Sequence, residues 1–198
     1  MLKNNIFYVI LAVILFSCGH NDLSIADKLY ESGKYKEAIE SYSDIIENAP
    51  RNVNAFYNRG RSYEEINNIN KAESDFKKVL QLDEKNVSAM LSLAKLYYQN
   101  GQYSKALIYS QNALKINENS GDGYFLAARA QHQLGYVDAA MESYSLALKI
   151  NKNYGEAYLY RGALKVHLKQ TKSACEDFKK AENLNVQEAS SIRKTYCK

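Results

Sequence analysis

The sequence predicts an all-α fold built from tandem repeats, and three observations lead to that prediction. First, Ala recurs five times at intervals of 34 residues, at Ala38, Ala72, Ala106, Ala140 and Ala174. Second, the residue five positions before each of these Ala residues is turn-prone in four of the five copies. These residues are Gly33, Asn67, Gly101, Gly135 and, as the exception, Lys169. Third, the 198 residues include a single Pro and are 46% apolar, which is typical of an ordered helical domain. Five copies in one register indicate a repeat protein.

The N-terminal segment differs from the repeats. After Lys3, an unbroken apolar run extends from Ile6 to Phe16, which suits a signal-peptide core and is shorter than the roughly 20 residues that span a bilayer as a helix. The run ends in Leu15-Phe16-Ser17-Cys18, which resembles the bacterial lipobox. The resemblance implies a lipoprotein signal peptide over residues 1–17, a lipid (palmitate among its acyl chains) on Cys18, and a tether over residues 18–21. The alternatives are an ordinary signal peptide cut elsewhere and an uncleaved anchor.

The 34-residue pattern resembles the tetratricopeptide repeat (TPR) family over about residues 19–188. Counted from 1 to 34, position 8 of the repeat is small in every copy, at Ala26, Gly60, Ala94, Ala128 and Gly162. Position 24 is aromatic in four copies, at Tyr42, Phe76, Tyr144 and Phe178, with Ser110 in the third. Repeat 5 departs from the family with Lys165 and Lys169, where Tyr and Gly are usual.

The resemblance implies a right-handed α-α superhelix of five helix-turn-helix repeats within residues 22–188. Their bounds are about 19–52, 53–86, 87–120, 121–154 and 155–188. Each repeat is a pair of antiparallel helices, A and B, and the first pair is expected at about 22–32 and 35–48. Small residues at position 8 and at the Ala of position 20 allow the helix axes to approach to roughly 8–10 Å. Ile192 and Tyr196, four residues apart, predict a short capping helix over residues 189–198.

The chain has three Cys residues. If Cys18 carries the lipid, Cys175 and Cys197 remain as a pair. An exported chain enters an oxidising compartment, where an even number of remaining Cys residues indicates a possible disulfide. In the family, the position of Cys175 leans toward the following helix, which here is the cap that carries Cys197. We therefore expect a disulfide that fastens the cap to repeat 5. Two free thiols are the alternative.

Repeats 2 and 5 share an Arg at position 7 and an Asp at position 23, which the other repeats lack. These residues are Arg59 with Asp75, and Arg161 with Asp177. Their joint occurrence predicts an ion pair between helices A and B of each repeat, with the planar guanidinium favouring a two-pronged contact. Chance co-occurrence is the alternative.

The TPR resemblance implies that helix A lines the concave face and that a partner binds there. Position 5 forms an expected apolar stripe of Tyr57, Leu91, Phe125 and Leu159. Position 9 forms a basic stripe of Arg61, Lys95 and Arg129, and position 12 adds Tyr30, Tyr98 and His132. These stripes suit an extended or helical peptide with acidic groups or a free carboxylate. Solvation alone at position 9 and local packing at position 5 are the alternatives.

Nothing in the sequence predicts an enzyme, a metal site or a cofactor. The three His residues, His20, His132 and His167, fall in different units, and no metalloprotease, CxxC, phosphate-loop or nucleophile-elbow motif occurs. The formal net charge of +4 comes without a block of Lys and Arg, which argues against nucleic acid.

The sequence therefore predicts an exported, membrane-anchored scaffold that mediates protein–protein interactions in the bacterial cell envelope. The alternative is a fixed structural subunit of an outer-membrane assembly, pilus or secretion machine. Gly19 follows the lipidated Cys, and the acidic inner-membrane retention signal of some bacteria is missing there. We therefore expect the outer membrane, facing the periplasm or the cell surface.

Overall fold

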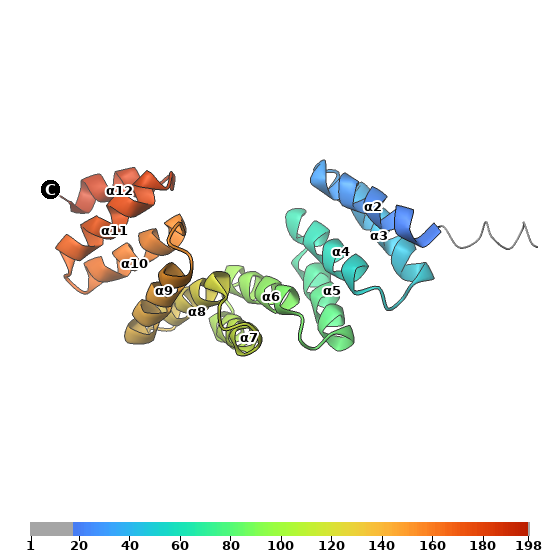
Figure 1. Ribbon diagram of the computed structural model, residues 1–198, viewed down its shortest axis with the longest axis horizontal. Helices are drawn as coiled ribbons and strands as arrows, with labels where there is room; N and C mark the ends of the chain where they lie inside the picture. Colours follow the sequence, from blue (N-terminus) through green and yellow to red (C-terminus); the bar gives the residue numbers. More distant parts are fainter. Residues whose placement is uncertain (1–17, 198) are drawn as a thin grey trace, which may run out of the picture. The chain divides into compact units, whose positions relative to one another are not determined.

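The computed structural model describes residues 18–197, and every regular element in that range is an α-helix (Figure 1). The predicted signal peptide, residues 1–17, and Lys198 lie outside the described residues. The helices are α2 (Cys18–Glu31), α3 (Tyr35–Asn48), α4 (Val53–Glu65), α5 (Ile69–Leu82), α6 (Val87–Gln99), α7 (Tyr103–Ile116), α8 (Gly121–Gln133), α9 (Val137–Ile150), α10 (Gly155–His167), α11 (Thr171–Asn183) and α12 (Ala189–Tyr196). The all-α fold, with two helices per repeat and a terminal cap, is confirmed.

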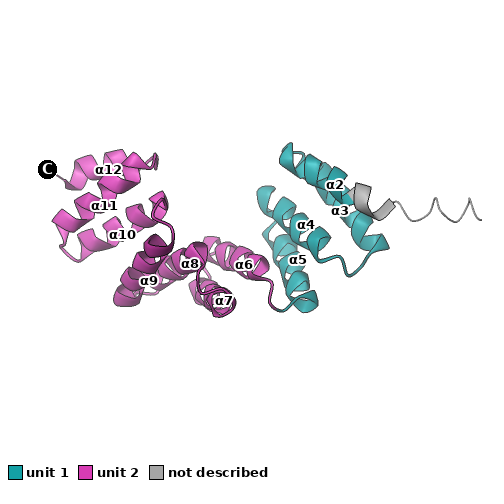
Figure 2. Cartoon of the chain, viewed as in Figure 1, with its two compact units in different colours: residues 1–84 teal, residues 85–198 magenta. Residues whose placement is uncertain are grey.

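The chain forms two compact units, coloured separately in Figure 2. Unit 1 extends to Glu84 and contains α2 to α5, which are repeats 1 and 2. Unit 2 begins at Lys85 and contains α6 to α12, which are repeats 3 to 5 and the cap. Within each unit, every helix packs against the next one along the chain. Even-numbered helices from α2 to α10 are the A helices, and odd-numbered helices from α3 to α11 are the B helices.

Three residues separate helix A from helix B in every repeat, and the middle residue always has a positive φ angle. In repeat 1 the Gly33 amide donates to the Tyr30 carbonyl and the Lys34 amide to the Leu29 carbonyl, both at 2.9 Å. This pair of bonds is the Schellman termination, which needs a left-handed residue after the helix. The same turn therefore explains the turn-prone residues spaced 34 apart. Lys169 adopts it at φ 60°, so repeat 5 keeps the turn without Gly or Asn.

The core is made of small residues between helices A and B and of large rings beside them. The five Ala residues at position 20 are fully buried, and so are the four aromatic residues at position 24. In repeat 3, Ser110 replaces the ring and turns its hydroxyl back to the Ala106 carbonyl at 2.8 Å. Tyr97, 1% exposed, stacks on the neighbouring Tyr109 with ring centroids 5.4 Å apart. Aromatic packing in this repeat therefore comes from a different pair of positions.

The first helix begins four residues earlier than expected. The backbone is helical from Cys18, so residues 18–21 belong to α2 and do not form the predicted extended tether. No Pro occurs before Pro50, so nothing in this segment forces the helix to stop. A helix advances about 1.5 Å per residue, and an extended chain more than 3 Å, so Cys18 is closer to repeat 1 than expected. None of the described helices is long and apolar enough to cross a membrane.

The cap is held by the expected disulfide. Cys175 on α11 is bonded to Cys197, which follows α12, with their Cα atoms 5.7 Å apart. Ala189 is fully buried and Ile192 packs against the same cluster, which contains Phe178. Tyr196, expected beside Ile192 on the covered face, is half exposed instead. An ion pair of 2.7 Å between Arg193 and Glu182 adds a second link to α11.

Both expected Arg–Asp pairs are present and two-pronged. Arg59 donates from Nε and Nη2 to the two carboxylate oxygens of Asp75, both at 2.8 Å. Arg161 reaches Asp177 in the same way, at 2.9 and 2.7 Å. Both carboxylates are buried, with side chains 6% and 5% exposed. Each pair therefore links helix A to helix B within one repeat.

A third residue, not expected from the sequence, completes each pair. Nη1 of Arg59 donates to the Ser43 hydroxyl at 3.1 Å, and Nη1 of Arg161 to the Ser145 hydroxyl at 3.2 Å. Each Ser stands at position 25 of the preceding repeat, where the other repeats have Lys77, Gln111 and Lys179. Each Arg–Asp–Ser cluster therefore joins two successive repeats. In repeat 5 the unusual Lys165 also contacts Asp177, at 2.7 Å.

The Arg–Asp–Ser cluster generates a prediction about stability. Replacing Arg59→Met should lower the free energy of unfolding by about 3 kcal/mol, because it leaves the Asp75 carboxylate buried without a cation. Chemical denaturation of the full chain measures the change. The double variant Arg59→Met/Asp75→Leu should recover most of the loss, and Arg51→Met, at an exposed site, should change stability by less than about 0.5 kcal/mol. Equal losses in the single and double variants would contradict a buried ion pair.

A second prediction concerns the closest approach of helices A and B. A Cβ atom at Gly162 would lie 2.6 Å from a ring carbon of Phe178, which is fully buried and held by its neighbours. We expect Gly162→Ala to lower the free energy of unfolding by about 1–2 kcal/mol, although Ala favours the helix. Gly121→Ala is the matched control, because a Cβ there meets only ordinary contacts at 3.6 Å or more, and it should be neutral or slightly stabilising. A Gly162→Ala chain as stable as the parent would refute the steric argument.

Candidate partner-binding surface

The prediction of an exposed apolar stripe at position 5 is wrong in unit 2. Phe125 and Leu159 are 7% and 6% exposed and belong to the core clusters, while Leu91 is half-buried. The Phe125 ring lies 4.6 Å from that of Tyr154 and 6.2 Å from that of Tyr144. In unit 1, Tyr57 is half-buried with its ring 5.7 Å from Phe76. Phe125 and Leu159 are packed into the core of unit 2, so position 5 offers a partner little apolar surface there.

The position-9 cations are accessible, and two of them lie on aromatic rings. Arg61 in unit 1 and Lys95 in unit 2 are exposed, and Arg129 in unit 2 is half-buried. The guanidinium carbon of Arg61 lies 4.7 Å from the ring centre of Tyr30, and that of Arg129 lies 4.0 Å from Tyr98. These are cation–π distances. In both cases the Tyr stands 31 residues before the Arg, at position 12 of the preceding repeat.

In unit 1 this surface is closely hydrogen-bonded. Asp27 accepts from the Tyr42 hydroxyl at 2.6 Å and from the Asn58 amide at 2.9 Å, which joins α2, α3 and α4. Burial and the Asp27 carboxylate raise the pKa of Tyr42, so this hydroxyl stays protonated and remains a donor. Tyr30, whose ring Arg61 contacts, donates to Glu65 at 3.4 Å. Asp27 and Glu65 on this surface therefore already have hydrogen-bond partners.

In unit 2 the surface is built around Arg129. Its guanidinium carbon lies 4.0 Å from the ring of Tyr98 on α6, 4.8 Å from Tyr160 on α10 and 5.7 Å from Phe125 on α8. We call these four residues the Arg129 cage. Three successive A helices contribute to it, so the cage exists only when repeats 3, 4 and 5 are stacked. Sequence reasoning found Tyr98, Phe125 and Arg129 but missed Tyr160, which stands at position 6.

His132 completes the predicted set and lies beside a second His. Its ring is 6.4 Å from that of His167, edge to face, across α8 and α10. Burial and the neighbouring His167 both lower the pKa of His132, which favours its neutral form. No group of three or more His, Cys, Asp or Glu side chains among residues 18–197 is arranged to hold a metal ion.

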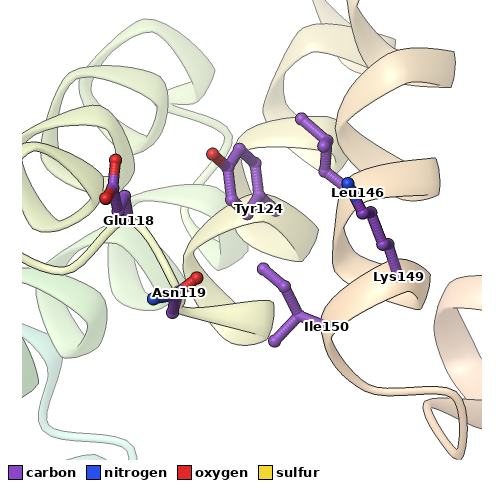
Figure 3. Close-up of a pocket in the computed structure, with 6 residues that line it drawn as sticks. All are labelled: Glu118, Asn119, Tyr124, Leu146, Lys149 and Ile150. Carbon is purple, nitrogen blue, oxygen red and sulfur yellow. The ribbon is translucent and has the colours of Figure 1, made fainter.

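A shallow cavity of about 550 Å³ lies elsewhere in unit 2, beside the loop that precedes α8. Figure 3 shows the side chains that line it, which are Glu118, Asn119, Tyr124, Leu146, Lys149 and Ile150. The lining combines one acid, one base, an amide and a phenol with two aliphatic side chains.

Comparison with known proteins supports the repeat assignment. Residues 26–67 match the family model described as TPR repeat. Residues 65–147 match the model described as anaphase-promoting complex, cyclosome, subunit 3. No curated protein matches the sequence significantly.

Several solved structures share the fold. A crystal structure of MamA is 25% identical with a TM-score of 0.73, covering 84% of this chain and 97% of that one. YrrB, described as a TPR protein with an unusual peptide-binding site, is 20% identical with a TM-score of 0.71, covering 89% and 92%. PilF of Pseudomonas aeruginosa is 15% identical with a TM-score of 0.80, covering 88% and 79%.

None of these matches indicates a catalytic family. The 34-residue register, the helix pairs and the matching family models agree, and together they support the TPR repeat family for this chain.

Proposed function

We propose that this protein is a TPR scaffold that binds another protein through its A helices while a lipid on Cys18 holds it at a bacterial membrane. The single observation that carries the binding role is the pair of Arg residues on Tyr rings, Arg61 with Tyr30 and Arg129 with Tyr98. Neither Arg serves the core in the way that Arg59 and Arg161 do, because neither makes a two-pronged bond to a buried carboxylate. Accessible Arg and Tyr side chains on a rigid support are typical anchors of protein interfaces.

The structural neighbours are consistent with this role. YrrB is described as having a peptide-binding site, and a stack of helix pairs presents a comparable row of A helices in each unit of this chain. A rigid, preorganised surface binds a flexible partner segment at a lower entropic cost than a surface that must first become ordered.

The membrane role has its support in the sequence. The apolar run to Phe16 and the lipobox-like Leu15-Phe16-Ser17-Cys18 favour export and lipidation, and more than one acyl chain is what stable anchoring requires. Since α2 begins at Cys18, the lipid would be attached directly to the first helix of repeat 1. The lack of an acidic residue after Cys18 favours the outer membrane, on its periplasmic or cell-surface side.

A second candidate function is a fixed structural subunit of an outer-membrane assembly, pilus or secretion machine. The disulfide and the capped C-terminal end favour it, because they stabilise unit 2 as a rigid element. Purification from solubilised membranes separates the two candidates. A fixed subunit copurifies in constant stoichiometry, whereas a recruiting scaffold does not.

The binding role predicts where a partner touches the chain. A photo-crosslinking amino acid that replaces Lys95, which is exposed on α6, should form one dominant adduct in cells, identified by mass spectrometry. The same amino acid in place of Ser104, which is exposed on α7 of the same repeat, should form little adduct, because Ser104 lies on helix B. Equal adducts at both positions, or adducts at Ser104 alone, would contradict binding through the A helices.

The anchoring role predicts that Cys18→Ser abolishes incorporation of labelled palmitate and releases the chain from the membrane fraction. Fractionation and labelling in the native host measure both effects. The Cys197→Ser chain is the control, because it loses the disulfide but keeps Cys18. If Cys18→Ser chains still incorporate palmitate, lipidation at this residue is wrong.

A further inference from the structure

Ile25 on α2 is a large apolar residue that the fold leaves uncovered, with its side chain 54% exposed. It stands at position 7 of repeat 1. In repeats 2 and 5 the residues at this position, Arg59 and Arg161, each reach a Ser of the preceding repeat, and in repeat 4 Ala127 is 2% exposed. Position 7 therefore faces the preceding repeat. Within residues 18–197, α2 is the first helix, so no described repeat lies there to cover Ile25.

The residues that follow Ile25 show which way it points. Ala26 is fully buried in the core of unit 1, and Asp27 accepts hydrogen bonds from Tyr42 on α3 and Asn58 on α4. Successive residues of an α-helix are turned by about 100° around its axis, so Ile25 is about 200° away from Asp27. Ile25 is therefore turned away from both helices that pack against α2.

The opposite end of the solenoid is closed. Ala189 and Ile192 of α12 pack on the last core cluster, and the disulfide between Cys175 and Cys197 holds this helix in place. A stack of repeats needs such a cover at each end, because a terminal repeat otherwise leaves apolar surface in water. In the part of the chain that the structure describes, repeat 5 has a cover and repeat 1 has none.

The uncovered side of α2 also includes the position of the proposed lipid. Cys18, Asp22, Ile25 and Leu29 follow one another at intervals of four, three and four residues, so they form one row along the helix. We call this row the open face of α2. Cys18 and Ile25 are two turns apart, or about 10 Å along the axis. Acyl chains attached at Cys18 therefore bring a bilayer, rather than a second protein, to the open face.

The charges of the open face suit an electrically neutral lipid surface. Asp22 lies in the row, and the exposed Lys28 borders it, so their formal charges cancel. A helix that lies on a membrane buries its apolar side chains about 5–10 Å into the boundary between headgroups and acyl chains. One Ile binds a membrane weakly by itself, but once the lipid is inserted the second contact is intramolecular and needs little affinity of its own.

We propose that the open face of α2 rests on the bilayer, with Ile25 inserted among the lipid headgroups. This inference rests on the proposed function, because it requires the lipid on Cys18. The membrane then takes the place of the missing cap of repeat 1. Repeat 2 packs on α2 and α3 from the other side, so it lies farther from the membrane than repeat 1 does.

Fluorescence of the lipidated full chain on vesicles of zwitterionic phosphatidylcholine tests the contact. In an Ile25→Cys chain the new thiol is the one available to an environment-sensitive dye, because Cys18 carries the lipid and Cys175 and Cys197 are bonded to each other. The emission should shift to shorter wavelength, and it should fall about twofold when the lipids carry a quencher at the top of the acyl chain. If the chain binds the vesicles but the dye emits as it does in water, the proposal is wrong.

Two further labelling sites locate the contact. Ile108→Cys is the matched control, because Ile108 is also an Ile with 54% exposure but lies on α7 in unit 2, and its dye should emit as in water. A dye at Ser24→Cys, exposed on α2 and turned by about 100° from Ile25, should be quenched less than the dye at Ile25. Circular dichroism establishes that each labelled chain folds. Equal quenching at Ile25 and Ile108 would refute a specific contact of the open face.

A second copy of the chain is the other occupant that the experiment detects. An emission shift that the quencher-bearing lipids do not affect, and that disappears when the chains are diluted below one per vesicle, would assign the open face to a second copy and overturn the proposal.

Failure of this proposal and failure of the anchoring role give different results. A parent chain that carries no lipid and does not bind vesicles sinks the anchoring role, and the bilayer contact with it. A lipidated chain that binds vesicles while the dye at Ile25 stays in water sinks the contact alone.

Discussion

The close approach of helices A and B within each repeat is the constraint on which the rest of this structure depends. Small residues at position 8 and Ala at position 20 bring the two helices together, and at Gly60 and Gly162 there is no room even for a Cβ atom beside the facing ring. A hairpin packed this closely still exposes an apolar side, which must be covered by the next repeat. Stacking therefore follows from the hairpin. The surface that a partner can reach is what remains after stacking.

Much of the fold could be predicted because its signals are local and repeated. The turn between helices A and B requires a left-handed residue, and the 34-residue spacing of Gly and Asn displays that requirement four times. The bounds of α3 and α5 fall where the register places them, at 35–48 and 69–82. The predicted start of α2 was wrong because no repeat precedes α2 to set the register. The ends of helices also carry less sequence signal than their interiors.

The surface was harder to predict than the fold. The repeat register predicts which positions share a helix face. The burial of a side chain also depends on which side chains of neighbouring elements pack against it. Phe125 is buried because two rings pack against it, that of Tyr154, the residue before α10, and that of Tyr160 on α10 itself. The third partner of Arg59 was missed for a related reason. Ser43 lies on the preceding repeat, and the comparison of positions within one repeat cannot reveal a contact between repeats.

The two kinds of Arg site differ in what the guanidinium group contacts, and the Arg residues at position 7 serve stability by neutralising a buried carboxylate. At position 7 the guanidinium meets a buried carboxylate, so its charge is neutralised and both edges are used. At position 9 it meets a Tyr ring, which orients the group without neutralising it. Desolvating an Arg without a counter-charge is costly, and a half-buried group keeps part of its hydration. A cation that a ring orients without neutralising fits the binding role proposed above.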